Sequence, residues 1–123
     1  MPIIRSDDAP GFELPGIDVT GYAAPARGSK DSTTYRLDLH PRAELPKHRH
    51  DHEEIVHVLS GPFTQVIDDE EHVLQAGDTA IIPSGALHHG YATDGTAALY
   101  CAMPVGTVMQ RLDGTEAVPP WAS

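Results

Sequence analysis

The chain has 123 residues, 40% of them hydrophobic, which is enough for one domain with a modest core and too few for a second domain. Its formal net charge of −10 argues against nucleic acid or an anionic membrane surface as a partner, because both need a basic patch. A single cysteine excludes an internal disulfide, and no apolar stretch resembles a membrane span or a secretory signal. We therefore expect a cytoplasmic protein.

Short β-rich runs separated by Gly, Pro and Asp follow one another along the chain, and no helical periodicity of useful length interrupts them. The acidic stretch Asp68–Glu71 is expected to form a hairpin turn. The first 15 or so residues and the segment after Pro104 look irregular, with Trp121 able to pin that segment to the barrel. The predicted strands are Ile17–Tyr22, Thr34–His40, Glu54–Leu59, Phe63–Ile67, His72–Gln75, Thr79–Ile82, Leu87–Ala92 and Ala97–Met103. Many short strands at regular spacing predict an all-β sandwich or barrel.

The run Ile55–Leu59, within the predicted strand Glu54–Leu59, is apolar on both faces, apart from His57. Only one face of a strand in a small barrel can point inward, so the other must meet a second sheet or a second subunit. We therefore expect a homodimer.

Two short blocks of the sequence point to a metal site, because together they supply imidazole and carboxylate groups, which suit a borderline divalent ion. The candidate ligands are His48, His50, Glu54 and His88. Residues two apart on a strand share a face about 6.6 Å apart, so His48 and His50 can converge on one ion. On a straight strand Glu54 would lie too far from His48 to bind the same ion. The chain must therefore turn at Asp51–Glu53. His88 follows a Pro-Ser-Gly reversal and opens the returning strand.

The two blocks resemble the two sequence motifs of the cupin superfamily. His48, His50, Glu54 and Gly61 match the first motif, G-x5-H-x-H-x3-E-x6-G, at the right spacing. The second motif, G-x5-P-x-G-x2-H-x3-N, is matched by Gly77, Pro83, Gly85 and His88. The chain departs from the pattern at two positions that are not metal ligands in the family, with Arg42 at the opening glycine and Ala92 at the closing asparagine. Arg42 implies a different turn geometry there.

The resemblance implies a jelly-roll β-barrel (a double-stranded β-helix) of the small single-domain type. We expect one domain over residues 1–123, with a barrel core at about 30–104, an N-terminal arm at 1–29 and a C-terminal tail at 105–123. It also implies one divalent ion (Fe, Mn, Ni, Zn or Cu) held by the two histidines of the first motif, its glutamate and the histidine of the second. The ligand set alone does not determine which of these metals binds.

The remaining polar residues have less specific interpretations. His52 is expected to be exposed in the turn, although an exchange of ligand role with His50 is conceivable, and His57 to lie at an interface or on the outer sheet face. His89 is expected at the surface or behind the ligands, because it points away from His88. His40 and His72 are expected to be exposed. Four residues are candidates to line the barrel and touch substrate, with packing as the alternative role: Tyr35, Gln65, Tyr91 and Tyr100.

Two functions remain open at this stage. The first is a mononuclear metalloenzyme that acts on a small oxygenated organic molecule inside the barrel, by dioxygenase, lyase or isomerase/cyclase chemistry. Open coordination positions beside four protein ligands favour it. The second is a non-catalytic small-molecule-binding module with a structural metal, favoured by the short chain and the absence of an obvious general base.

Overall fold

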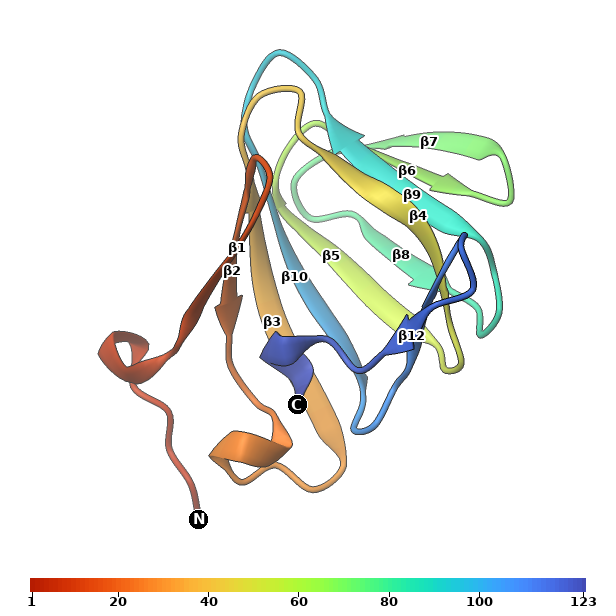
Figure 1. The fold of residues 1–123 in the computed structure, drawn as a ribbon. Coiled ribbons are helices and arrows are strands. Elements are labelled where there is room, and N and C mark those ends of the chain that lie inside the picture. Colours follow the sequence, from red (N-terminus) through yellow and green to blue (C-terminus); the bar gives the residue numbers. More distant parts are fainter.

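Two six-stranded antiparallel sheets face each other in the computed structural model, which describes residues 1–123 (Figure 1). The strands are β1 (Gly11–Leu14), β2 (Ile17–Gly21), β3 (Ser32–Leu39), β4 (Glu44–His50), β5 (Glu54–Ser60), β6 (Phe63–Ile67), β7 (Glu70–Leu74), β8 (Thr79–Ile82), β9 (His88–Ala92), β10 (Ala97–Pro104), β11 (Met109–Arg111) and β12 (Glu116–Ala117). Three short 3-10 helices are η1 (Ser6–Asp8), η2 (Pro25–Arg27) and η3 (Pro120–Ala122). The strand order is β1-β2-β3-β10-β5-β8 in one sheet and β12-β11-β4-β9-β6-β7 in the other. This confirms the expected all-β, jelly-roll class.

The core lies between the two sheets and follows from strand alternation. On β3, Tyr35, Leu37 and Leu39 are buried, whereas Arg36 and Asp38 between them point outward. The same period of two places Val56 and Val58 of β5 inside. The interior is therefore built from one face of each strand, as in a sandwich whose outer faces meet solvent. No helix of the structure is long and apolar enough to cross a lipid bilayer.

Tight turns connect the strands where the sequence predicts them. The β6–β7 hairpin turns on Asp68 and Asp69, both with positive φ, as a two-residue hairpin loop of this hand requires. The predicted turn at Asp68–Glu71 was two residues too long, since β7 already begins at Glu70. Gly77 and Gly85, the turn glycines of the second motif, have φ of 94° and 82°. Glycine adopts this left-handed region without a steric penalty, which explains their use on either side of β8.

Arg42, at the opening glycine of the first motif, has a φ of 63°. This is the left-handed conformation that glycine populates easily and that other L-residues reach at a cost. Its backbone N–H donates a 2.7 Å hydrogen bond to the Thr93 carbonyl, which ties the turn to the one after β9. The arginine at the glycine position of the motif therefore takes a conformation that favours glycine.

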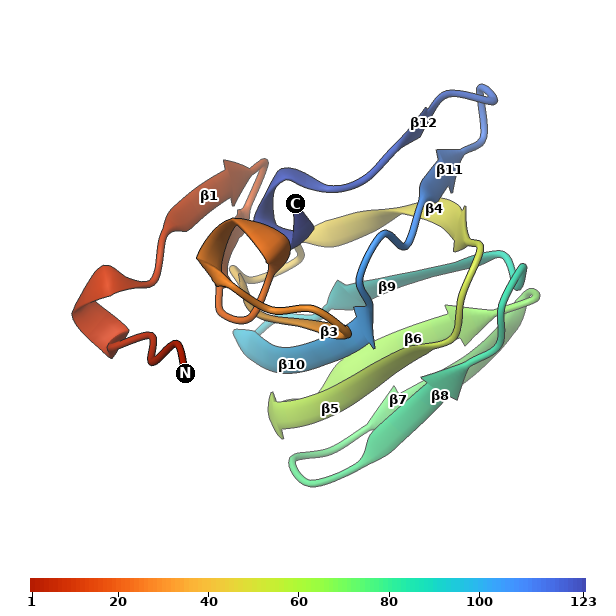
Figure 2. The ribbon, with the colours of Figure 1, turned by 90° about the horizontal axis from the view of Figure 1, so that it is seen from below.

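Strands also form in the two segments that were expected to be irregular. β1 pairs with β2, and β11 pairs with both β4 and β12. These strands are short, and the partner of β11 lies about 60 residues earlier in the chain, so local pattern carried little signal. They extend each sheet on the same side of the sandwich, where η3 packs against β2 and β3 (Figures 1 and 2).

An apolar strip covers part of the outer face of the first sheet. Ile55 of β5 lies beside Ile81 of β8, and His57 lies beside Tyr100 of β10. Ile81 is 60% exposed and Leu59, on the same face of β5, is 41% exposed. The second sheet does not cover this face, and its apolar side chains are exposed.

Candidate metal centre

The four candidate ligands come from both sheets. Three lie on two antiparallel strands of one sheet, and the fourth lies at the start of a strand in the other sheet. His48 and His50 project from β4, and His88 from β9, where His48 and His88 are direct cross-strand partners. Glu54 begins β5 in the opposite sheet, after the chain has turned through residues 51–53. The predicted turn between His50 and Glu54 is present, and it brings the carboxylate to the histidines across the barrel interior.

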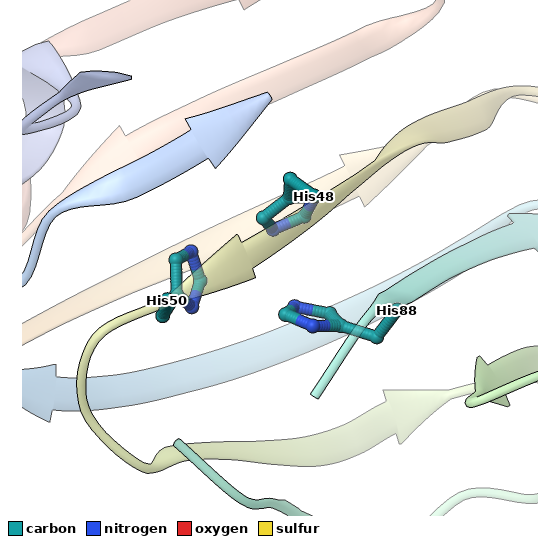
Figure 3. Close-up of side chains that lie close together, drawn as sticks. All are labelled: His48, His50 and His88. Atoms are coloured by element: carbon teal, nitrogen blue, oxygen red, sulfur yellow. The ribbon is translucent and has the colours of Figure 1, made fainter. Parts of the chain in front are cut away.

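The three imidazoles converge on one point inside the barrel (Figure 3). One ring nitrogen of each lies within 4.8 Å of those of the other two. The ring centroids are 4.2 Å apart for His48 and His88, 4.7 Å for His48 and His50, and 5.1 Å for His50 and His88. Three nitrogens bound to one ion at about 2.1 Å each lie roughly 3.0–3.6 Å from one another. The three rings therefore face one point, and some of their nitrogens would approach one another by up to roughly 1–2 Å on binding an ion.

Hydrogen bonds on the far side of two rings orient their free nitrogens toward this point. His48 Nδ1 lies 2.7 Å from the Pro46 carbonyl and His88 Nδ1 lies 2.9 Å from the Ala86 carbonyl. A carbonyl only accepts, so each Nδ1 carries the proton and each Nε2 keeps its lone pair. His88 Nε2 and His50 Nδ1 are buried and have no hydrogen-bond partner. Buried nitrogens without partners are costly, and a metal ion would satisfy both.

The Glu54 carboxylate adjoins two of the rings. One oxygen lies 3.6 Å from His50 Nδ1 and the other 3.6 Å from His88 Nε2. The Tyr35 hydroxyl donates a 2.6 Å hydrogen bond to the Oε2 atom of this carboxylate. Glu54 is 5% exposed, so this bond also supplies a polar partner that water cannot.

Burial and mutual charge keep the His48 and His50 rings neutral. Burial lowers the pKa of His48 to about 4, and positive charge on the neighbouring His88 ring would lower it further. Burial likewise lowers the pKa of His50. For Glu54, burial favours the protonated form, but the adjoining His88 and His50 rings and the hydrogen bond from the Tyr35 hydroxyl together lower its pKa. Neutral imidazoles beside an ionised carboxylate are the protonation states that bind a divalent cation.

The group therefore has the composition, protonation and unsatisfied nitrogens of a metal site, and three histidines of this chain are able to hold a metal ion. Glu54 is placed beside them but stands slightly apart from the set of three.

A cavity of about 700 Å³ opens from these residues toward the side of the sandwich formed by β1 and β11. Its walls are largely apolar, with Leu37, Val56 and Leu99 between the sheets. Cys101 also lies on this wall and is 1% exposed. Burial, followed by the negative charge of Glu54, raises the pKa of both the Tyr35 hydroxyl and the Cys101 thiol. Both are therefore protonated at neutral pH, and neither is a base.

Two of the four residues proposed to line the barrel face the cavity. Tyr35 reaches Glu54, and Gln65 lies on the cavity wall with its Nε2 donating to the His89 carbonyl. Tyr91 and Tyr100 lie on outer faces, which corrects the expectation for them. The Tyr91 hydroxyl donates to Glu71, and the Tyr100 ring stacks on Tyr22. Tyr91 is three residues from His88, so strand parity alone would have placed it outside.

The other histidines lie away from the group of three. His52 is exposed, with Nδ1 2.8 Å from Asp51, and His40 and His72 are also exposed. His57 is on the outer face of β5, with Nδ1 2.8 Å from the Thr79 hydroxyl. His89 is half-buried and alternates with His88 along β9, and it is the one of these other histidines that lines the cavity. His50 and His52 do not exchange places, since His50 is buried among the other candidate ligands and His52 is exposed.

Sequence reasoning missed the residues that close the outer part of the cavity. Phe12 and Leu14 come from β1, Met109 from β11, and Trp121 from η3. Trp121 was expected only to pin its segment, which it does by packing against Phe12 and Tyr35. A lone tryptophan after two prolines was the only signal of this role.

Comparison with known proteins agrees with this architecture. Residues 35–103, more than half of the chain, match the family described as Cupin domain. No curated protein sequence matches the chain.

Three solved structures illustrate the likeness. The polyketide cyclase RemF from Streptomyces resistomycificus has a TM-score of 0.80 at 17% identity, over 91% of this chain and 85% of that one. A sugar phosphate isomerase of the cupin superfamily from Silicibacter pomeroyi has a TM-score of 0.70 at 21% identity, over 98% and 95%. A salicylate 1,2-dioxygenase from Pseudoaminobacter salicylatoxidans, as an adduct with gentisate, has a TM-score of 0.67 at 20% identity, over 76% of this chain and 26% of that one. At these identities the three structures show the shared fold alone. The family match over residues 35–103 contains all four candidate ligands, and we conclude from it that this chain belongs to the cupin family.

Proposed function

We propose that this protein is a mononuclear metal-dependent enzyme that acts on a small oxygenated organic molecule in the cavity between its sheets. The single observation that carries the proposal is the convergence of His48, His50 and His88, with two buried nitrogens that have no other partner, at the inner end of a 700 Å³ cavity. A purely structural histidine cluster would satisfy its nitrogens within the protein and would not face an open cavity.

Glu54 is proposed as the fourth ligand. Its two oxygens are 3.6 Å from nitrogens of His50 and His88, and it is ionised in their presence. Three neutral imidazoles and one carboxylate leave one positive charge on a divalent ion. An anionic ligand is therefore favoured beside it.

The residues around the group have roles that do not depend on which metal is present. Tyr35 holds the Glu54 carboxylate in place through its short hydrogen bond and keeps its own proton. The apolar walls exclude water, which strengthens every charge interaction in the site. When bound, a divalent ion supplies Lewis-acid stabilisation of negative charge on a substrate oxygen and, for a redox-active metal, reactivity toward dioxygen.

The reaction is proposed to be of the dioxygenase, lyase or isomerase/cyclase type. Similar structures carry the names cyclase, isomerase and dioxygenase, which supports this range of chemistry for a site with few acid–base groups of its own. Tyr35 and Cys101 are protonated, so the metal and its ligands must provide most of the catalysis.

Metal content tests the proposal directly. Protein purified without metal-affinity steps is analysed by elemental mass spectrometry, beside His50→Ala and the matched control His52→Ala. Wild type and the control are expected to hold close to one ion per chain, and His50→Ala to lose most of it, because His52 is exposed and His50 is a buried ligand. Equal metal in the two variants would contradict the assignment, as would a wild type that binds none after reconstitution.

The identity of the metal then directs the activity assay. Iron, manganese, nickel or copper calls for oxygen-consumption measurements, and zinc for lyase, isomerase and cyclase screens.

A non-catalytic binding module with a structural metal is the second candidate. The observation that favours it is that Tyr35 and Cys101, which lie on the cavity wall beside the ligand set, are both protonated, so neither can act as a general base. Ligands that bind the metal-loaded protein and are recovered unchanged would favour this candidate over the enzyme.

We further propose that the chain, as one domain, forms a homodimer through the apolar strip on the outer face of the first sheet. Ile81, Leu59 and Tyr100 are exposed there, and the strip continues along three adjacent strands. A sheet face of this kind is stabilised when a second copy removes it from water.

A further inference from the structure

The hydroxyl of Tyr35 is the point where side chains from three distant parts of the chain meet. Tyr35 lies on β3, is 4% exposed, and pairs in register with Cys101 of β10. Its hydroxyl donates a 2.6 Å hydrogen bond to Oε2 of Glu54, one of the candidate ligands. The Cys101 thiol and the Trp121 indole are its other hydrogen-bonding neighbours. Because Tyr35 is almost fully buried, protein groups rather than water determine the direction of its O–H bond.

The indole of Trp121 offers the kind of partner that this hydroxyl lacks. A hydroxyl that gives its one proton to a carboxylate still has lone pairs that accept, and an indole N–H only donates. The centroids of the Trp121 and Tyr35 rings are 6.0 Å apart, at an interplanar angle of 53°. The contact of the buried N–H with the Tyr35 hydroxyl is weaker than a standard hydrogen bond, and no other group competes for it. Donation therefore runs in one direction, from Trp121 to Tyr35 and from Tyr35 to Glu54.

The indole is held against Tyr35 by the first sheet and its connections. Arg27 donates from Nη2 to the Trp121 carbonyl at 3.1 Å and from Nε to the Tyr22 carbonyl. The Ala26 N–H donates to the Ser123 carbonyl at 3.2 Å, and η3 packs against β2 and β3. The indole is therefore in place before an ion binds, which reduces the ordering cost of binding.

This contact connects the candidate metal centre to a segment outside the matched family region. Residues 105–123 follow that region and cross back to the edge formed by β1, β2 and β3 (Figures 1 and 2). Groups that hydrogen-bond a metal ligand fix its orientation, and their removal typically weakens metal binding by roughly 10- to 100-fold. A hydroxyl that accepts a hydrogen bond also donates more strongly, so the indole reinforces the bond from Tyr35 to Glu54.

We propose that Trp121 is a positioning residue for the candidate metal centre, which acts through the Tyr35 hydroxyl to hold the Glu54 carboxylate in its metal-binding orientation. This inference rests on the proposed metal-dependent function, and it gives the segment after β10 a role in metal affinity. If Trp121 only closed the cavity with apolar surface, its N–H would be dispensable.

Zinc affinity in a double-mutant cycle tests the proposal. Dissociation constants are measured by competition with a chromophoric chelator for wild type, Tyr35→Phe, Trp121→Phe and the double variant. Tyr35→Phe should weaken zinc binding by roughly 10- to 100-fold. Trp121→Phe keeps an aromatic ring but removes the N–H, and should weaken binding by roughly 3- to 10-fold, the worth of one hydrogen bond. The double variant should bind zinc as Tyr35→Phe does, because the N–H has nothing left to act through.

Tyr91→Phe is the matched control. Its hydroxyl also donates to a glutamate, Glu71, but on an outer face of the second sheet. Its removal should leave zinc affinity unchanged. A loss in this control as large as that in Tyr35→Phe would overturn the proposal, because the effect would then not depend on the bond to Glu54.

The chain contains one tryptophan, so its indole N–H gives a single reporter signal in a ¹H–¹⁵N spectrum. Zinc should shift this signal in the wild type, because the ion draws charge from the Glu54 carboxylate and so changes the Tyr35 hydroxyl. The shift should be much smaller in Tyr35→Phe. The wild-type measurement needs no variant, so it tests the coupling even if a substitution prevents folding.

The outcomes separate this inference from the proposed function. Zinc affinity in Trp121→Phe equal to that of the wild type overturns the role of Trp121 and leaves the metal centre intact. Losses of affinity that multiply in the double variant overturn action through Tyr35, as does an indole signal that zinc leaves unmoved in the wild type. A wild type that takes up no zinc or other divalent ion overturns the proposed function itself, and with it this inference.

Discussion

Acidification should destabilise the metal-free protein through His48. Burial and the neighbouring His88 lower the pKa of His48 from an ordinary value of 6.5 to about 4 in the folded state. The unfolded chain, with the ordinary value, therefore takes up a proton as the pH falls below 6.5, while the folded chain does not until about pH 4. Stability present above pH 6.5 is lost progressively as the pH falls, and the loss levels off below about 4.

The size of the effect follows from the shift. One pKa unit corresponds to about 1.36 kcal/mol, so full linkage between pH 7 and pH 4 would cost about 3 kcal/mol. We expect about 2 kcal/mol, since the His48 ring is only partly buried and water screens part of its charge. This is a large fraction of the stability of a small domain. Glu54 acts in the same direction. Its pKa is also lowered in the folded state, so the stability that its ionised carboxylate contributes is lost as the pH falls and it becomes protonated.

Urea unfolding of EDTA-treated protein at pH 7, 5.5 and 4 measures this loss. His48→Gln removes the titrating ring, so its stability should depend on pH less steeply than that of the wild type by about 2 kcal/mol over this range. His52→Gln, at an exposed histidine outside the site, should follow the wild type. Parallel pH profiles for wild type and His48→Gln would refute the reasoning, since they would show that the ring titrates normally when folded.

Three further predictions concern the fold. A Cβ at Gly90 would lie 2.2 Å from the buried Phe63 ring, so Gly90→Ala should destabilise the protein by about 1–3 kcal/mol in thermal or urea unfolding. Gly95 has open space around it, so Gly95→Ala should cost little stability. Equal losses of stability in the two variants would refute the packing argument. Arg42→Gly relieves a left-handed conformation and should be more stable than Arg42→Ala by about 1 kcal/mol, and the reverse order would show that the turn is not strained. Ile81→Lys should convert the proposed dimer to a monomer in light scattering, and a monomeric wild type would contradict the dimer.

The strands and the candidate ligands were largely readable from the sequence. Alternation placed His48 and His50 on one face, and the gap to Glu54 required the turn that the structure contains. The turn glycines Gly77 and Gly85 occupy the positive-φ positions that no other residue fills as easily. These features depend on neighbours within a few residues, so local sequence determines them.

The cavity was decided only by the tertiary structure. Phe12 and Trp121 are separated by more than a hundred residues, and they meet because β1 and η3 reach the same edge of the sandwich. β11 finds its partner in β4 through a pairing that no local pattern encodes. Short strands have weak propensities of their own, and their pairing is stabilised by contacts that exist only once the barrel has formed. The candidate metal ligands follow from spacing along the chain, whereas the walls around them follow from which distant segments the fold brings together.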